Sequence, residues 1–166
     1  MGVLFVCLGN ICRSPLAEGI FLSHARARRV SDLFDVDSCG TGGWHVGAPP
    51  DPRSIGVAAA RSIVLNHLAR RLDPPADFRR FSVILAMDRS NARDIAAAGE
   101  THGLVPPKIR LVLDRAGRQT PPHQLDVPDP YYGGADGFER VFEMLDTACA
   151  ALVDELAADG RDPSNQ

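Results

Sequence analysis

The sequence predicts an α/β fold: a four-stranded parallel sheet flanked by helices, in one domain over residues 1–158. Four short apolar runs alternate with segments of helical character, and strands that alternate with helices form a parallel sheet covered on both faces. The first run leads directly into a loop that suits an anion, and ligands of such sheets lie beyond the carboxyl ends of the strands. The length of 166 residues and a hydrophobic content of 45% fit one domain with its own core.

In the first half of the chain, the apolar run 3–6 predicts a buried strand. A helix is expected over residues 15–29, because Ser14 is a good N-cap and Pro15 suits the first helical position. The next three elements are a strand, a glycine- and proline-rich loop and a helix, expected at residues 33–39, 40–52 and 53–66.

In the second half, Asp73-Pro74-Pro75 interrupts the chain. A helical turn, a strand, a helix and a strand are expected at residues 76–80, 81–87, 88–98 and 109–113. Residues 114–136 indicate a long irregular loop, and a loop of this length inside a domain is often functional. An apolar face from Phe138 to Leu156 predicts a last helix, and the polar residues 159–166 are expected to be a disordered tail.

Composition argues against several classes of function. A net charge of −3 does not suggest a nucleic-acid partner, and no apolar stretch is long enough to cross a membrane. The N-terminal run is too short and lacks the basic flank of a signal peptide. The four cysteines, at positions 7, 12, 39 and 149, form no Cys-x-x-Cys pair and have no histidines at zinc spacing. We therefore expect no metal, no cofactor and a reduced, cytoplasmic setting.

The segment from Cys7 to Ser14 connects the first strand to the first helix and carries the candidate chemistry. Backbone N–H groups of such a loop converge on one point, where the helix dipole adds positive potential for an anion. Arg13 follows Cys7 by six residues, and a guanidinium binds two phosphate oxygens at once. The same field stabilises a thiolate, which is a nucleophile toward phosphorus. The segment therefore predicts hydrolysis of a phosphate ester through a phosphocysteine.

The remaining residues of this loop are expected to surround the anion. Gly9 and Asn10 tolerate the positive φ angles that a loop curling around an anion requires. Backbone amides along the loop would stabilise the equatorial oxygens of the phosphoryl group. The expected phosphate-binding positions are Leu8, Gly9, Asn10, Ile11, Cys12 and Ser14.

Two motifs carry a resemblance to a known family. The first is Cys7-Leu8-Gly9-Asn10-Ile11-Cys12-Arg13-Ser14-Pro15, directly after an N-terminal strand, and the second is Val127-Pro128-Asp129-Pro130-Tyr131-Tyr132-Gly133. With both motifs, the chain resembles the low-molecular-weight protein tyrosine phosphatases over residues 3–157. The resemblance implies a flavodoxin-like three-layer sandwich and hydrolysis of phosphotyrosine in proteins.

The resemblance also implies roles for individual residues. Asp129 would be the general acid and then the base that activates water, whereas the nearby Asp126 and Asp136 do not fit the motif. Ser14 would hydrogen-bond the thiolate, and Asn10 would hold the loop in shape. The residues expected to give structural support are Ser38 and His67.

Trp44, Tyr131 and Tyr132 lie in loops rich in glycine or proline, where burial is less expected. Aromatic walls of this kind would sandwich a phenyl ring and so select phosphotyrosine. The resemblance implies that Trp44 and Tyr131 line the mouth of the cleft. Cys12 has two possible roles: a small apolar filler of the loop, or, as the resemblance implies, a thiol that captures an oxidised Cys7 as a reversible disulfide, which would make the enzyme redox-sensitive.

Two rival functions are weighed against this one. An arsenate reductase on the same fold needs two further cysteines close together, and Cys39 and Cys149 are far apart in the sequence. A non-catalytic phosphotyrosine-binding module would have lost Cys7 or Asp129, and both are present. A P-loop nucleotide site is excluded because the Gly-Lys-Ser/Thr ending is missing. We expect a monomer that acts on phosphotyrosine-containing proteins, with weak self-association left open.

Overall fold

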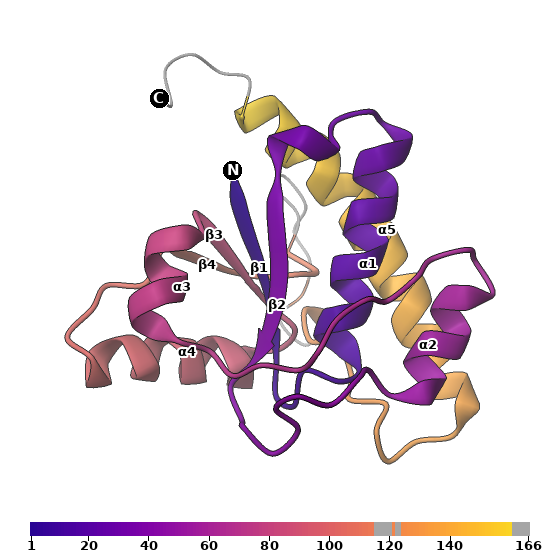
Figure 1. The fold of residues 1–166 in the computed structure, drawn as a ribbon, viewed down its shortest axis with the longest axis horizontal. Coiled ribbons are helices and arrows are strands. Elements are labelled where there is room, and N and C mark those ends of the chain that lie inside the picture. Colours follow the sequence, from indigo (N-terminus) through magenta and orange to yellow (C-terminus); the bar gives the residue numbers. More distant parts are fainter. Residues whose placement is uncertain (115–120, 122–123, 161–166) are drawn as a thin grey trace.

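A four-stranded sheet lies between two groups of helices in the computed structural model, which describes residues 1–114, 121 and 124–160 (Figure 1). The neighbouring strands are parallel and follow the spatial order β2-β1-β3-β4. The strands are β1 (Gly2–Cys7), β2 (Asp35–Gly40), β3 (Val83–Ala86) and β4 (Lys108–Leu111). This arrangement confirms the predicted α/β fold with a four-stranded parallel sheet between helical layers.

The helices form the two outer layers (Figure 1). On one side of the sheet lie α1 (Arg13–Ala27), α2 (Pro52–Ala59) and α5 (Ala135–Asp159); on the other lie α3 (Pro74–Arg80) and α4 (Arg89–Thr101). Successive side chains of β1 point to opposite faces. Val3 and Phe5 therefore pack in the core that contains α1 and α5, whereas Leu4 and Val6 pack in the core that contains Ile95 of α4.

Strand β1 lies in the middle of the sheet and is buried along its whole length. Cys7 is its last residue, so this side chain lies at the carboxyl end of the strand, the edge of a parallel sheet at which ligands commonly bind. Two backbone bonds extend the same edge: Met87 donates to the Val6 carbonyl, and Val127 donates to the Met87 carbonyl. The segment that contains Asp129 is thereby attached next to the end of β1.

Helix α1 begins at Arg13, two residues before the predicted start, and the prediction that Ser14 is its N-cap is wrong. Cys12 occupies the N-cap position, and no side chain caps the helix there. The Ser14 hydroxyl lies inside the first turn and contacts the Cys7 sulfur and the Asn10 side chain instead. Serine occurs both at N-caps and inside the first turn of helices, so the sequence alone does not distinguish these two positions for Ser14.

Helix α2 ends at Ala59, so the helix predicted over 53–66 is too long. Ser62 has a positive φ of 60°, which ends the helical path. The chain beyond it forms backbone bonds with distant segments, including Ala69 to Ala48 and Gly40 to Arg70. The end of the helix itself is local: the Ile63 N–H donates back to the Ala58 carbonyl at 3.0 Å and closes the last turn.

The other predicted helices and strands of the described chain have bounds within three residues of those observed. A short 3-10 turn at Ser31–Leu33 precedes β2 and was not predicted. Asp159, which was assigned to a disordered tail, is the last residue of α5. The rest of that tail, residues 161–166, and parts of the predicted loop 114–136 lie outside the described residues.

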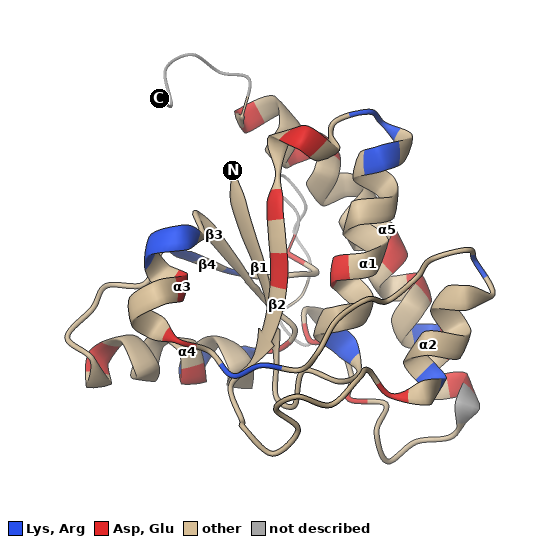
Figure 2. Ribbon diagram, viewed as in Figure 1, with Lys and Arg blue, Asp and Glu red and all other residues tan. Residues whose placement is uncertain are grey.

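Acidic and basic residues are mixed over the helices on both faces of the sheet (Figure 2). Neither helical layer carries charge of a single sign. In the described part of the chain, no helix is both long and apolar enough to span a membrane.

Candidate active site

Cys7 lies at the base of the loop between β1 and α1, with only 3% of its surface exposed. Its sulfur is 3.0 Å from the Ser14 hydroxyl, and the backbone N–H of Asn10 donates to it over 3.2 Å. A hydroxyl and an amide that point at one sulfur stabilise negative charge on it. The geometry therefore suits a thiolate, held where α1 begins.

Arg13 is buried beside this sulfur, with 3% of its surface exposed. One guanidinium nitrogen donates to Asp88 at 2.7 Å and to the Val127 carbonyl at 3.0 Å, while the other donates to Asp129 at 3.1 Å. Burial opposes the charge of Arg13, but the neighbouring Cys7, Asp129 and Asp88 raise its pKa above that of an ordinary arginine. Arg13 is thus a fixed cation at the site.

Asp88 is a site residue that the sequence analysis missed. It lies two residues after the end of β3 and is the N-cap of α4, where its carboxylate accepts the backbone N–H of Asn91 at 2.7 Å. The same carboxylate holds Arg13. The available signal was its position: an acidic residue just after a parallel strand lies at the ligand-binding edge of the sheet.

Asn10 organises the interior of the loop. It has a positive φ of 55° and 1% exposure. Its amide nitrogen donates to the hydroxyls of Ser14 and Ser38, at 2.9 and 3.0 Å. Its amide oxygen lies 2.8 Å from Nε2 of His67 and accepts the backbone N–H of Arg70 at 2.8 Å. Ser38 and His67 therefore both lie within hydrogen-bond distance of the Asn10 side chain.

Gly9 does not have the positive φ that was predicted for it; in this loop only Asn10 does. Gly9 lies close to a neighbouring side chain instead. A Cβ there would lie 3.1 Å from the ring of His45, which belongs to the loop that carries Trp44. His45 is a further cleft residue that the sequence analysis missed, because nothing in the local sequence points to it.

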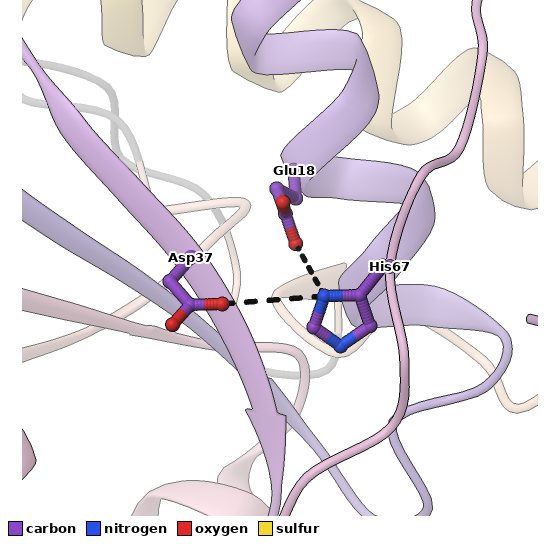
Figure 3. Close-up of side chains that lie close together, drawn as sticks. All are labelled: Glu18, Asp37 and His67. Atoms are coloured by element: carbon purple, nitrogen blue, oxygen red, sulfur yellow. Dashed lines mark ion pairs between the residues drawn. The ribbon is translucent and has the colours of Figure 1, made fainter. Parts of the chain in front are cut away.

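Behind Asn10, Glu18, Asp37 and His67 point toward one another (Figure 3). Oε2 of Glu18 lies 3.3 Å from Nδ1 of His67 and accepts the Ser38 hydroxyl at 2.7 Å, and Oδ1 of Asp37 lies 4.0 Å from Nδ1. These three residues are a set that could hold a metal ion, with ligand atoms within 4.8 Å of one another. They were not foreseen, because they come from three distant segments of the chain.

The carboxyl group of Glu18 is expected to change protonation near neutral pH. Burial raises its pKa from 4.5 to about 7, against the opposing effect of the hydrogen bond from Ser38. Burial likewise lowers the pKa of His67. Burial therefore favours the neutral form of both Glu18 and His67.

Replacing Glu18 by glutamine is expected to reduce the loss of stability between pH 5 and pH 8. The unfolded carboxyl ionises near pH 4.5 and the folded one near 7, so stability is lost as pH rises through this window. Wild type should lose on the order of 1–3 kcal/mol more than the variant, which cannot ionise there. Urea denaturation at both pH values measures the difference, with the exposed Glu143→Gln as control. Equal pH dependence in wild type and Glu18→Gln would contradict this account.

The loop opens into a cleft of about 320 Å³ that also contains Asp129 and the three aromatic residues named from the sequence, Trp44, Tyr131 and Tyr132. Asp129 has 43% of its side chain exposed, and its Oδ1 accepts the backbone N–H of Tyr131 at 3.1 Å. The rings of Tyr131 and Tyr132 meet edge to face, with centroids 4.9 Å apart. The acid candidate and the aromatic residues therefore face the same space as Cys7.

The four cysteines are free thiols in different surroundings. Cys12 lines the cleft with Cys7, and burial, followed by the effects of Asp51 and Cys7, raises its pKa to about 12. Cys39 lies in the core beneath α4, whereas Cys149 lies in the core formed with α1 and donates to the Ala17 carbonyl. Neither extends toward the cleft, so the described chain offers no thiol relay from Cys7 to the surface.

A parallel α/β sheet with a cysteine under an anion-binding loop, a buried arginine and an aspartate in one cleft defines a cysteine-based phosphatase. The family model described as low molecular weight phosphotyrosine protein phosphatase matches residues 2–162. The chain belongs to this family.

Relatives support this assignment over most of the chain. It is 46% identical to the low molecular weight phosphotyrosine protein phosphatase of Schizosaccharomyces pombe over 86% of this chain and 88% of the relative. For the Homo sapiens protein of the same name, the identity is 39% over 92% and 94% of the two chains.

Solved structures agree. A protein tyrosine phosphatase from Entamoeba histolytica superposes with a TM-score of 0.83, at 34% identity over 96% of this chain and 98% of its own. A Drosophila arginine phosphatase superposes with a TM-score of 0.85, at 32% identity over 94% of this chain and 98% of its own.

Proposed function

We propose that this protein hydrolyses phosphotyrosine, and aryl phosphate monoesters in general, through a phosphocysteine intermediate. The observation that carries the proposal is the environment of Cys7: its sulfur accepts the Asn10 N–H, lies 3.0 Å from the Ser14 hydroxyl, and opens into one cleft with Arg13 and Asp129. The substrate is a phosphoprotein.

In the first step, the Cys7 thiolate attacks phosphorus and the bond to the leaving oxygen breaks. The guanidinium of Arg13 and the loop amides stabilise the equatorial oxygens, and Asp129 gives its proton to the leaving oxygen. Arg13 is supported in this role by Asp88 and the Val127 carbonyl, which fix one of its nitrogens. Asp129 is supported by its exposure and by its place in the same cleft as Cys7, where a leaving oxygen can reach it.

In the second step, Asp129 is a carboxylate and takes a proton from water, which attacks the phosphocysteine and releases phosphate. The leaving group is then the Cys7 thiolate, and the Ser14 hydroxyl at 3.0 Å stabilises it. Asp129 thus regains in the second step the proton that it gave up in the first, and the Cys7 thiolate is restored.

Replacing Arg13 by lysine is expected to lower kcat/KM at least about tenfold although the charge is kept, because an ammonium cannot replace a bidentate fork. Lysine also has a single nitrogen, whereas Arg13 uses one nitrogen for Asp88 and the Val127 carbonyl and a second one for Asp129. Steady-state kinetics with p-nitrophenyl phosphate measure the loss. Arg26→Lys, an exposed change on α1, is the control. Near-normal kcat and KM in Arg13→Lys would contradict the assignment.

Replacing Trp44 by alanine is expected to weaken turnover of aryl phosphates more than that of small alkyl phosphates. Trp44 lines the cleft with 75% of its surface exposed, so its ring is available to a substrate ring. The ratio of the two kcat/KM values should fall about 3- to 10-fold, the range of one aromatic contact. Val46→Ala, an exposed change in the same loop, should leave the ratio unchanged. Equal losses for both substrate classes would make Trp44 a structural residue.

A direct assay tests the proposed function. The purified protein is given p-nitrophenyl phosphate and a phosphotyrosine peptide in EDTA, with a phosphoarginine peptide and arsenate reduction run beside them. Phosphotyrosine turnover that EDTA does not abolish supports the proposal. Preference for phosphoarginine would align the protein with the Drosophila arginine phosphatase instead, and arsenate reduction or binding without turnover would favour the rival functions.

We expect the enzyme to act as a monomer in a reducing compartment such as the cytoplasm. The four free thiols support such a setting, since a nucleophilic cysteine must remain reduced. The disulfide between Cys7 and Cys12 stays a prediction, supported by the burial of both thiols in one cleft.

A further inference from the structure

A second hollow, of about 590 Å³, lies beside the cleft and is not used by the proposed chemistry. Leu8 and Trp44 line both hollows, so the two share a wall. The rest of the second hollow is formed by residues 41–42, the segment 71–74, helix α4 and His102, which follows that helix. We call it the flanking groove, because it adjoins the cleft across Leu8 and Trp44.

Trp44, which forms the wall between the two hollows, packs against a segment that is bonded to the active-site loop. A Cβ on Gly42 would lie 1.9 Å from Cζ3 of Trp44, so the indole lies directly against the Gly42 backbone. The Gly42 N–H donates to the Leu8 carbonyl at 2.9 Å, and the Thr41 N–H donates to the Cys7 carbonyl at 3.0 Å. Trp44 is therefore supported by a segment that is bonded to the active-site loop, and it offers its exposed ring to both hollows.

The flanking groove combines an apolar floor with carboxylates. Leu72 and Ala98 contribute apolar surface, while Asp73 and Asp94 are exposed at the groove. Among the described residues, neither carboxylate forms an ion pair, and Asp94 only accepts a 3.4 Å hydrogen bond from Thr41. Arg71 is the lining cation that opposes them. Two carboxylates and an exposed indole favour a side chain with an aliphatic stem and a positive head.

We propose that the flanking groove binds a lysine or arginine side chain that lies close to phosphotyrosine in the substrate protein. This inference rests on the proposed function, since it assigns the substrate class of the same site. The stem of the basic residue would lie on Leu72 and Ala98, and its cation would meet Asp73, Asp94 and the face of Trp44. The extended chain advances about 3.3 Å per residue, so the basic position is within a few residues of phosphotyrosine.

The kinetic test uses a set of phosphotyrosine peptides that are identical except for arginine, alanine or glutamate at each of three positions on either side. At one or more positions, arginine should give about 3- to 10-fold higher kcat/KM than alanine, the range of an exposed ion pair with a cation–π contact. Glutamate there should give a lower value than alanine. The preference should weaken as salt is raised.

Variants of the groove separate it from the chemistry. The double variant Asp73→Asn/Asp94→Asn should lose the preference for arginine while turnover of p-nitrophenyl phosphate stays unchanged. Arg71→Gln should strengthen the preference, because the opposing cation is removed. Asp32→Asn, an exposed change before β2, is the matched control and should leave the preference intact.

Binding gives a second readout that does not need turnover. Trp44 is the single tryptophan of the chain, so its fluorescence reports on the wall of the groove. In the Cys7→Ser variant, the arginine peptide should change this fluorescence at lower concentration than the alanine peptide. If it does so while wild type hydrolyses no peptide, the proposed function fails and the groove assignment stands. Equal kcat/KM values for the arginine, alanine and glutamate peptides would overturn the inference. A preference for the glutamate peptide that Arg71→Gln abolishes would overturn it as well.

Discussion

Replacing Cys7 by serine is expected to lower kcat by at least about 10⁴-fold, the scale seen when a catalytic nucleophile is removed. A serine hydroxyl is similar in size but ionises far less readily than a thiol, and the two donors at Cys7 are placed to stabilise a thiolate. The side chain is buried at the end of β1, and a near-isosteric change there should leave the fold intact. Turnover of p-nitrophenyl phosphate and a circular-dichroism melt measure the two effects.

Cys149→Ser provides the opposite pattern as a control. Cys149 is fully buried in the core between α1 and α5, so a hydroxyl there should lower the melting temperature and leave kcat nearly unchanged. Hydrolysis near the wild-type rate in a clean Cys7→Ser preparation would rule out Cys7 as the nucleophile.

Replacing Asp129 by asparagine is expected to lower kcat by about 10²- to 10⁴-fold, the usual contribution of a general acid–base. The loss should shrink for substrates with good leaving groups, because these need less protonation. A series of aryl phosphates with leaving groups of different basicity measures this dependence in wild type and variant.

Asp126→Asn is the matched control for this experiment. The Arg89 side chain and backbone N–H donate to the Asp126 carboxylate at 2.6–3.2 Å, and these bonds lower the pKa of Asp126. Asp126 also does not line the cleft that contains Cys7 and Asp129, so it is poorly placed to give a proton to a substrate there. If Asp126→Asn produced the leaving-group pattern and Asp129→Asn did not, the general acid would be misassigned.

The parts of the site that could be predicted from sequence are those encoded locally. Cys7 and Arg13 belong to one short segment between a strand and a helix, where spacing alone brings them to one anion. Asp129 and the aromatic residues Trp44 and Tyr131 lie in loops whose composition marks them as exposed, and the family motif indicates their location.

The remaining residues reach the site through tertiary structure. Asp88 contacts Arg13 only because β3 lies next to β1, and Glu18 meets His67 across two segments that are far apart in sequence. These contacts depend on partners that no local pattern specifies. The early end of α2 has a different origin, since the positive φ of Ser62 turns the chain back and the Ile63 N–H closes the last turn on the Ala58 carbonyl.

The two chemical groups of the site are attached to parts of the molecule with different resistance to local opening. Cys7 ends β1, which is buried along its length and paired on both sides, so its neighbouring amides should exchange hydrogen only with global unfolding. Asp129 lies on an irregular, half-exposed segment that local opening can release. Mild denaturant would therefore remove proton donation before it displaces the nucleophile, and the enzyme would first become selective for good leaving groups rather than inactive.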